Sequence, residues 1–259
     1  MTLGERMKEY EMQSRTRLLR RTPVIIRLDG CHFHTFTKGL SKPYDHELMN
    51  IMQDTMVYLC QNIQGCCFGY TQSDEITLVL IDYKNINSSA WFDNQVQKIC
   101  SVAASLATNY FNKGIINFLD WLHNKDIVFN QHIYDLWHSK LFMASFDARA
   151  FNIPENEIIN NLIWRQQDCT RNSINLLGQQ YFSHSELNGI KANDLQNKLL
   201  IEKNVNWNNE PTSFKRGSCC YKQEGGVWCL DLNMPILTEN REYINNIIKN
   251  AKGENNGSN

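Results

Sequence analysis

The chain has 259 residues, of which 42% are hydrophobic, and its 26 basic and 27 acidic side chains leave a net charge of −1. This length can bury a substantial core, as one large domain or as a compact domain with appended helices. No apolar run is long enough to cross a bilayer, which argues against a membrane protein, and the near-neutral charge argues against a uniformly basic nucleic-acid binder.

Cysteine usage and the N-terminal residues indicate the cellular compartment. The first residues lack an apolar signal core, so we do not expect secretion. The chain has nine cysteines, an odd number, and no C-x-x-C motif. The adjacent pairs Cys66–Cys67 and Cys219–Cys220 would point their side chains to opposite faces of a strand. We therefore expect reduced, mostly buried thiols in a cytoplasmic protein.

The N-terminal segment Leu3–Leu19 is charged and has a helical pattern. Four arginines lie near its end, at Arg15, Arg17, Arg20 and Arg21. They indicate either a local RNA contact or the solvated end of a helix. Pro23 follows, at a position where a strand can begin without its N–H.

Two stretches of similar design come next. The apolar run Val24–Leu28 predicts a buried strand that ends in Asp29 and Gly30, and a turn carrying Asp74 opens a second strand, Ile76–Ile81. Carboxylates at adjacent strand ends suit two-metal phosphoryl transfer, because Mg²⁺ takes a few oxygen ligands and leaves its other positions for phosphates and water. The alternative is that each aspartate caps its own turn.

The order of elements indicates the fold class. A helix is predicted after Asp45, which is either its N-cap or a site residue, and a second over Trp91–Phe111. A later strand, Phe142–Phe146, leads into Asp147–Ala148–Arg149. Strand, helix, strand, strand, helix, strand resembles the ferredoxin-like palm of polymerases and nucleotidyl cyclases, an α+β fold with an antiparallel sheet and helices on one face.

The rest of the chain should append helices and a hairpin to this palm. Helices are expected over 154–180 and 192–203, and a hairpin turn over 224–226, whereas the tail 253–259 should be disordered. This divides the chain into a palm with its N-terminal helix (1–135), the rest of the palm with helices and hairpin (136–235), and a C-terminal helix and tail (236–259). We expect one compact unit.

Six motifs then favour a particular family. They are Arg27–Leu28–Asp29–Gly30, Phe33–His34, Lys42–Pro43–Tyr44–Asp45, Gln72–Ser73–Asp74–Glu75, Phe146–Asp147–Ala148–Arg149 and Trp164–Arg165–Gln166–Gln167–Asp168–Cys169. In order and rough spacing they resemble the tRNA(His) guanylyltransferase family of 3′-to-5′ nucleotide polymerases, which includes guanylyltransferase-like proteins that repair tRNA 5′ ends. The resemblance covers roughly residues 5 to 225.

The resemblance implies roles for individual residues. Two Mg²⁺ ions would be held by Asp29, Asp74 and the carbonyl oxygen of Gly30, with Lys42 and Asp45 catalytic at the transfer site. The nucleotide-binding set, for ATP and for GTP or another nucleoside triphosphate, would be Asp29, Gly30, Cys31, His32, Phe33, His34, Ser73, Asp74 and Lys98. The RNA-binding set would be Arg165, Asn172, Lys215 and Arg216.

Alternatives stay open for several of these residues. Lys42 could be a surface lysine, and Lys215 and Arg216 a solvated approach to the hairpin. The pair His32 and His34 indicates loop packing and phosphate contact in preference to a transition-metal site, since no third soft ligand has matching spacing. Glu75 should face away from Asp74, because neighbouring side chains in an extended segment point to opposite faces.

Two departures from the family pattern bear on the substrate. Members specific for tRNA(His) carry His-Ile-Asn-Asn where this chain has Thr170–Arg171–Asn172–Ser173, and Gln95 replaces an arginine. The first departure favours templated 5′-end repair of tRNA over guanylate addition to tRNA(His). A palm-like RNA-binding protein without catalysis is a weaker alternative, which retention of Asp29 and Asp74 opposes. The resemblance also implies a homo-oligomer, a tetramer.

Overall fold

The computed structural model describes residues 1–124, 130–223 and 225–253. One six-stranded sheet, in the order β4-β1-β3-β2-β5-β6, forms the centre of the molecule, and every neighbouring pair of strands is antiparallel. Its strands are β1 (Val24–Gly30), β2 (Cys66–Gln72), β3 (Glu75–Leu80), β4 (Phe146–Asn152), β5 (Ser218–Lys222) and β6 (Trp228–Asp231). The predicted hairpin is formed by β5 and β6, and Glu224 of its turn lies outside the described residues.

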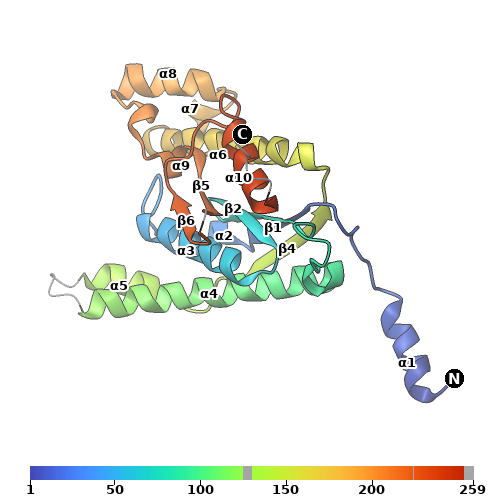
Figure 1. Ribbon diagram of the computed structural model, residues 1–259. Coiled ribbons are helices and arrows are strands. Elements are labelled where there is room, and N and C mark those ends of the chain that lie inside the picture. The colour runs from blue at the N-terminus through green and yellow to red at the C-terminus, as the bar shows by residue number, and fades with distance from the viewer. Residues whose placement is uncertain (125–129, 224, 254–259) are drawn as a thin grey trace.

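The expected palm order is confirmed as β1, α3 (His46–Asn62), β2, β3, α4 (Val96–Asn124) and β4. Alternate residues of β1 divide the core: Ile26 and Leu28 pack with α3 and α4, whereas Ile25 packs with residues of the appended helices. The palm helices α3 and α4 therefore cover one face of the sheet. The appended α6 (Ile158–Tyr181) and α10 (Glu242–Lys252) cover the other, as Figure 1 shows.

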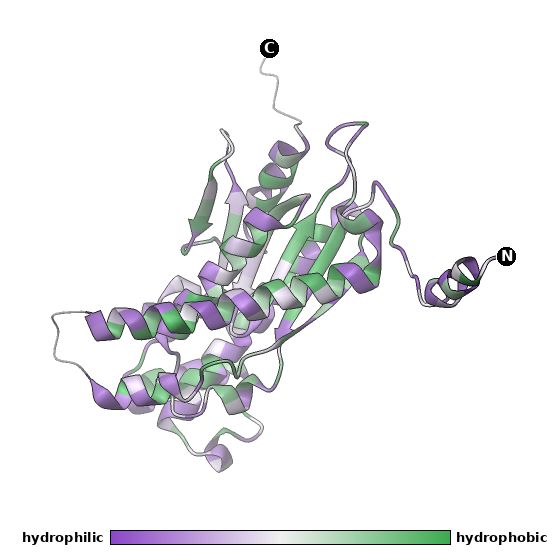
Figure 2. Ribbon diagram, turned by 90° about the horizontal axis from the view of Figure 1, so that it is seen from below, coloured by the Kyte–Doolittle hydropathy of each residue, from purple (hydrophilic) through white to green (hydrophobic). Residues whose placement is uncertain are grey.

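The remaining helices are short or peripheral. They are α1 (Leu3–Met12), α2 (Phe33–Phe36), α5 (Gln131–His138), α7 (His184–Leu187), α8 (Ala192–Lys203) and α9 (Thr212–Arg216), with single turns at Trp91–Asn94, Glu155–Glu157 and Trp207–Asn209. The predicted helix 192–203 is confirmed as α8, which packs on α6 around a third small core. Apolar residues concentrate on the inner helix faces and in the sheet (Figure 2).

The N-terminal helix is shorter than predicted. It ends at Met12 instead of continuing to Leu19, because Arg17 pairs as an isolated bridge with Gln95 and the N–H of Leu18 bonds to Asn94. No residue of α1 is buried, and α1 extends away from the rest of the chain in Figure 1.

The boundaries of β4 differ from the prediction as well. The strand begins at Phe146 instead of Phe142, since Asn112 of α4 donates to the carbonyl oxygen of Ala144 and Thr108 accepts the N–H of Phe146. Consequently Asp147 and Arg149 lie within the strand, where their Cα partners on β1 are Asp29 and Arg27.

The cysteines behave as expected. All nine are free thiols and five of them are buried. Cys66 contacts the core under α3 and α4, whereas Cys67 lies in the core under α6, so the adjacent pair does point to opposite faces. Among the described residues no helix is long and apolar enough to span a membrane. The cytoplasmic location stays a prediction, and residues 254–259 of the predicted disordered tail lie outside the described residues.

Candidate active site

The two predicted carboxylates meet at one end of the sheet. Asp29 is the penultimate residue of β1, and its Cα partner on β3 is Glu75, the residue after Asp74. The N–H of Gly30 donates to the carbonyl oxygen of Asp74 at 3.0 Å, which joins the two strand ends. A tight turn with Ser73 at a φ of 51° links β2 to β3 and presents Asp74.

Negative charge accumulates here. Burial raises the pKa of Asp29 above its ordinary value, and Glu75 and Asp147 raise it further by repulsion. Burial also raises the pKa of Asp74, to which the charge of Asp29 contributes. Two half-buried carboxylates whose ionisation is disfavoured by burial and by neighbouring negative charge fit a bound cation, because a divalent ion offsets both effects.

The donor set suits Mg²⁺ shared with a substrate. In the described part of the chain, no three His, Cys, Asp or Glu side chains lie close enough to hold a metal ion by themselves. Asp29, Asp74 and the Gly30 carbonyl supply two carboxylates and one carbonyl oxygen. Mg²⁺ is usually bound by one or two carboxylates together with phosphates and water, so this set fits the ion when a nucleotide is present.

Glu75 is engaged by two arginines. Its carboxylate accepts from Arg27 at 3.0 Å and from Arg165 at 2.8 Å. The carboxylate of Glu75 is therefore held in two ion pairs, and its exclusion from the metal site stays a prediction. The side chain of Arg165 is 5% exposed, and its guanidinium lies 3.5 Å from the ring centroid of Trp164. Arg165 was predicted to contact RNA at the surface, whereas the structure places it in a buried ion pair that holds α6 on the sheet.

The segment after Gly30 turns tightly beside the site. A Cβ at Gly30 would lie 2.3 Å from the ring of Phe33, so only glycine allows that ring to pack there. Phe33 is buried among Phe36, Phe111 and Phe146, and its ring therefore serves the core. Cys31 is half-buried, whereas His32 and His34 are exposed and remain available to a ligand.

A cavity of about 160 Å³ adjoins this site. Four predicted residues line it together, Lys42, Asp45, Ser73 and Asn172. Asp45 is the N-cap of α3: its carboxylate accepts from the N–H groups of Glu47, Leu48 and Ser41, so the capping interpretation is confirmed. Its catalytic role remains a prediction. Lys42 is exposed at the rim of the cavity.

Lys98 lies far from the carboxylates of its own chain. Thr108 of α4 bonds to Phe146, which pairs with Gly30, so residue 108 is level with the carboxylates. Lys98 lies ten residues earlier on the same helix, which corresponds to about 15 Å along its axis. The N-terminus of α4 thus points toward the opposite end of the sheet, and the nucleotide role of Lys98 stays a prediction.

Lys215 and Arg216 differ in their surroundings. Lys215 is buried: its ammonium group donates to the carbonyl oxygen of Asn208 and lies 5.5 Å from the ring centroid of Trp207. This contradicts, for Lys215, the alternative of a solvated approach to the hairpin, and its role in RNA binding stays a prediction. Arg216 is half-buried, and its carbonyl oxygen accepts from the hydroxyl of Tyr70.

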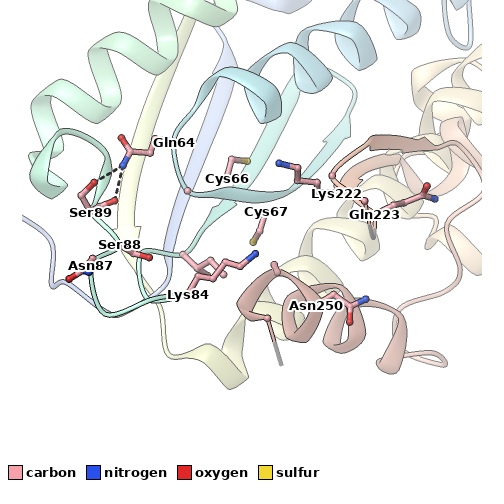
Figure 3. Close-up of a pocket in the computed structure, with 16 residues that line it drawn as sticks. Gln64, Cys66, Cys67, Lys84, Asn87, Ser88, Ser89, Lys222, Gln223 and Asn250 are labelled. Carbon is pink, nitrogen blue, oxygen red and sulfur yellow. Dashed lines mark hydrogen bonds between the residues drawn. The ribbon is translucent and has the colours of Figure 1, made fainter. Parts of the chain in front are cut away.

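One buried cation was missed by the sequence reasoning. The ammonium group of Lys140 donates to the carbonyl oxygens of Phe36 and Lys38, and thereby fixes the segment that follows the site. Its partners lie about a hundred residues away, so no local pattern could have identified it. A larger cavity, of about 790 Å³, lies at the other end of the sheet, beside Cys66 and Lys84 (Figure 3), and none of the predicted site residues line it.

The palm sheet and the paired carboxylates at its strand ends define a palm-type nucleotidyltransferase. Residues 4–154 match the family model described as tRNAHis guanylyltransferase. The chain belongs to that family.

Relatives and solved structures agree with this assignment. An uncharacterized protein of Acanthamoeba polyphaga mimivirus, R259, is 32% identical over 85% of this chain and 77% of its own length. The tRNA(His) guanylyltransferase 2 of Arabidopsis thaliana is 29% identical over 85% of this chain, which spans only 39% of that relative. A bacterial tRNA(His) guanylyltransferase (Thg1)-like protein in complex with ATP superposes with a TM-score of 0.83 and 40% identity, covering 95% of this chain and 99% of that one. A second such structure, in complex with GTP, gives a TM-score of 0.75 and 36% identity over the same shares.

Proposed function

We propose that this protein adds nucleotides in the 3′-to-5′ direction to the 5′ end of truncated tRNAs, selecting each nucleotide by Watson–Crick pairing with the opposing strand. The observation that carries the catalytic part is the pair Asp29 and Asp74, joined through the Gly30 N–H at the end of a palm sheet. Similarity to the ATP-bound and GTP-bound bacterial Thg1-like proteins supports nucleoside triphosphates as substrates.

The proposed metal-binding residues are Asp29, Asp74 and the Gly30 carbonyl. Bound there, Mg²⁺ would lower the pKa of the attacking hydroxyl group and neutralise charge on the leaving group. Arg27 and Arg165 hold Glu75 beside the pair, which keeps a third carboxylate away from the ligand positions. His32, His34 and Lys42 are exposed and can contact a triphosphate at this edge.

The proposed chemistry has two phosphoryl transfers. A 5′-monophosphate is first joined to the AMP moiety of ATP with release of pyrophosphate, unless the RNA already carries a 5′-triphosphate. The 3′-hydroxyl of the incoming nucleotide then attacks the activated 5′ phosphorus, losing its proton, and AMP or pyrophosphate leaves. Asp29 and Asp74 take part in both transfers, because the same 5′ phosphorus reacts twice and must be held at one site each time.

The segment Thr170–Ser173 supports truncated tRNAs of more than one identity as substrates. Thr170 donates to the carbonyl oxygen of Lys215, and Ser173 accepts from the indole N–H of Trp207, so both side chains serve packing. Arg171 is exposed and ion-paired with Asp168. A cation suits backbone phosphate, which positions an RNA without reading its sequence. We infer that this segment does not read an anticodon, and that the base pair at the gap selects the nucleotide.

The alternative function is guanylate addition at position −1 of tRNA(His), which the description of the matched family favours. The two functions separate in one assay. The protein is incubated with Mg²⁺, ATP, all four nucleoside triphosphates and a tRNA lacking its first nucleotide, with C, G, A or U opposite the gap, beside full-length tRNA(His). We expect repair of tRNAs of more than one identity, with the complementary nucleotide added each time.

Untemplated G on tRNA(His), with little repair of the truncated set, would instead establish the alternative. Absence of addition to every tRNA would favour the remaining alternative, a palm-like RNA-binding protein without catalysis.

We also infer that the chain forms a homo-oligomer, a tetramer by family resemblance. The unburied helix α1 supports assembly because it exposes Leu3, Met7 and Tyr10. Sedimentation of the full chain tests this.

A further inference from the structure

The outward face of β4 carries an unusual row of side chains. β4 is an edge strand, and alternate residues Asp147, Arg149 and Phe151 point to one face, where none of the three is buried. The side chain of Arg149 is 58% exposed, and Phe151 is 37% exposed. An aromatic ring and a guanidinium thus lie open to solvent beside β1, most of whose residues are buried.

This row begins at the candidate active site. The Cα partners of Asp147, Arg149 and Phe151 on β1 are Asp29, Arg27 and Ile25. From Asp147 to Phe151 the row extends about 13 Å away from the carboxylates. The guanidinium of Arg149 comes no closer than 3.8 Å to a carboxylate oxygen, of Asp147 or Asp29, so these contacts leave its N–H donors available.

Trp164 of α6 adds a second aromatic surface. It is 48% exposed, and the buried Arg165 lies against it at 3.5 Å. Arg27, the strand neighbour of Arg149, lies 5.8 Å from the same ring centroid. One part of the indole is therefore held by arginines while the rest remains in solvent. We call Arg149, Phe151 and Trp164 the β4 platform.

We propose that the β4 platform binds the 5′-terminal nucleotides of the RNA substrate, with a phosphate on Arg149 and bases stacked on Phe151 and Trp164. The proposal rests on the proposed function for its partner. Aromatic rings interleaved with arginine are what single-stranded or frayed RNA requires, since bases stack on the rings and phosphates pair with the cation. The platform also leads directly to Asp29, where the 5′ phosphorus must arrive. An interface with a second copy of the chain would not need to be continuous with the carboxylates.

The test compares Phe151→Ala and Arg149→Gln with matched variants on the opposite face of the sheet. Trp121→Ala removes an aromatic side chain of α4 that is 48% exposed, and Lys113→Gln removes an exposed cation of the same helix. Binding of a 5′-monophosphorylated tRNA that lacks its first nucleotide is measured at several salt concentrations, and GTP binding and the thermal midpoint are measured in parallel.

We expect Phe151→Ala to weaken tRNA binding about 5- to 100-fold, the range for loss of one stacked base, with GTP binding unchanged. Arg149→Gln should weaken binding and lower the salt slope by about one. Both control variants should bind like the wild type. tRNA binding unchanged in both platform variants would overturn the proposal.

Two further outcomes separate this proposal from its alternatives. If the wild type adds no nucleotide to any tRNA but its RNA binding still depends on Phe151, the platform stands and the proposed function fails. If Phe151→Ala dissociates an oligomer while tRNA binding of the resulting species is unchanged, the surface is an interface between copies and the proposal is wrong.

Discussion

The N–H of Gly30 donates to the carbonyl oxygen of Asp74 at 3.0 Å, and this bond fixes the relative position of the two carboxylates on neighbouring strands. Its geometry depends on Gly30, because the ring of Phe33 occupies the space that a side chain would need. The active-site end of the sheet is therefore built directly on the aromatic core beneath it.

Replacing Gly30 by alanine tests this coupling. The new Cβ would lie 2.3 Å from the Phe33 ring, which is held by Phe36, Phe111 and Phe146 and cannot retreat. We expect a loss of about 1–3 kcal/mol in the free energy of unfolding, measured by urea denaturation, together with reduced nucleotide addition. Gly4→Ala is the control, since only Thr2 lies within 4.0 Å of its Cβ. Equal stability of both variants would show that the ring is free to move.

Glu75→Gln tests the ion-pair network. Glu75 is the carboxylate closest to the buried Arg165, with Asp168 farther away at 3.6 Å. Removing it leaves a buried cation with poor compensation, so we expect a loss of about 3 kcal/mol in unfolding free energy. The double variant Glu75→Gln, Arg165→Met should recover part of this loss, because it removes the uncompensated charge. Additive losses in that cycle would contradict the pairing.

Lys215 and Arg216 should separate stability from RNA binding. Lys215→Met removes a charge-assisted hydrogen bond from the buried ammonium group to the carbonyl oxygen of Asn208, and we expect a loss of about 1–3 kcal/mol in the free energy of unfolding. Arg216→Gln should leave stability within about 0.5 kcal/mol and lower the salt slope of tRNA binding by about one. The two variants are compared by denaturation and by salt titration of tRNA binding. A changed salt slope in folded Lys215→Met, with none in Arg216→Gln, would reverse the assignment.

Local patterns predicted the features whose causes are local. The apolar run before Asp29, the turn before β3 and the N-cap at Asp45 depend on residues a few positions apart, and the palm order follows from them. Arg165 was placed at the surface because it lies on a polar helix stripe, and Lys215 because it precedes a hairpin. Their partners, Glu75 and the loop at Asn208, belong to other elements, and no spacing in the sequence reports those contacts.

Lys98 shows a different dependence on distant contacts. Its place on the helix was predicted, but whether that part of the helix lies beside the carboxylates depends on how far α4 extends past the sheet. The bonds from Thr108 and Asn112 to the start of β4 fix this register, and they move residue 98 to the remote end. The same bonds shift the start of β4 from Phe142 to Phe146, which places Arg149 on the sheet face beside Asp29.

The central claim is that Asp29 and Asp74 form a Mg²⁺ site, and the measurement that tests it most directly is the thermal midpoint of Asp29→Asn and Asp74→Asn with and without Mg²⁺ and GTP. The raised pKa of each carboxyl means that its charged form is disfavoured in the folded protein, so the metal-free wild type loses stability as the pH rises through these pKa values. Neutral asparagine removes that penalty.

We predict that the metal-free variants melt no lower than the wild type. Mg²⁺ with GTP at saturating concentration should raise the wild-type midpoint by roughly 5 to 10 °C but leave that of the variants nearly unchanged. Nucleotide addition by the variants should fall about 100- to 1000-fold or more, and Asp120→Asn, at an exposed position of α4, should match the wild type throughout. Variants that keep the Mg²⁺-dependent shift and near-normal turnover would contradict the two-carboxylate metal site.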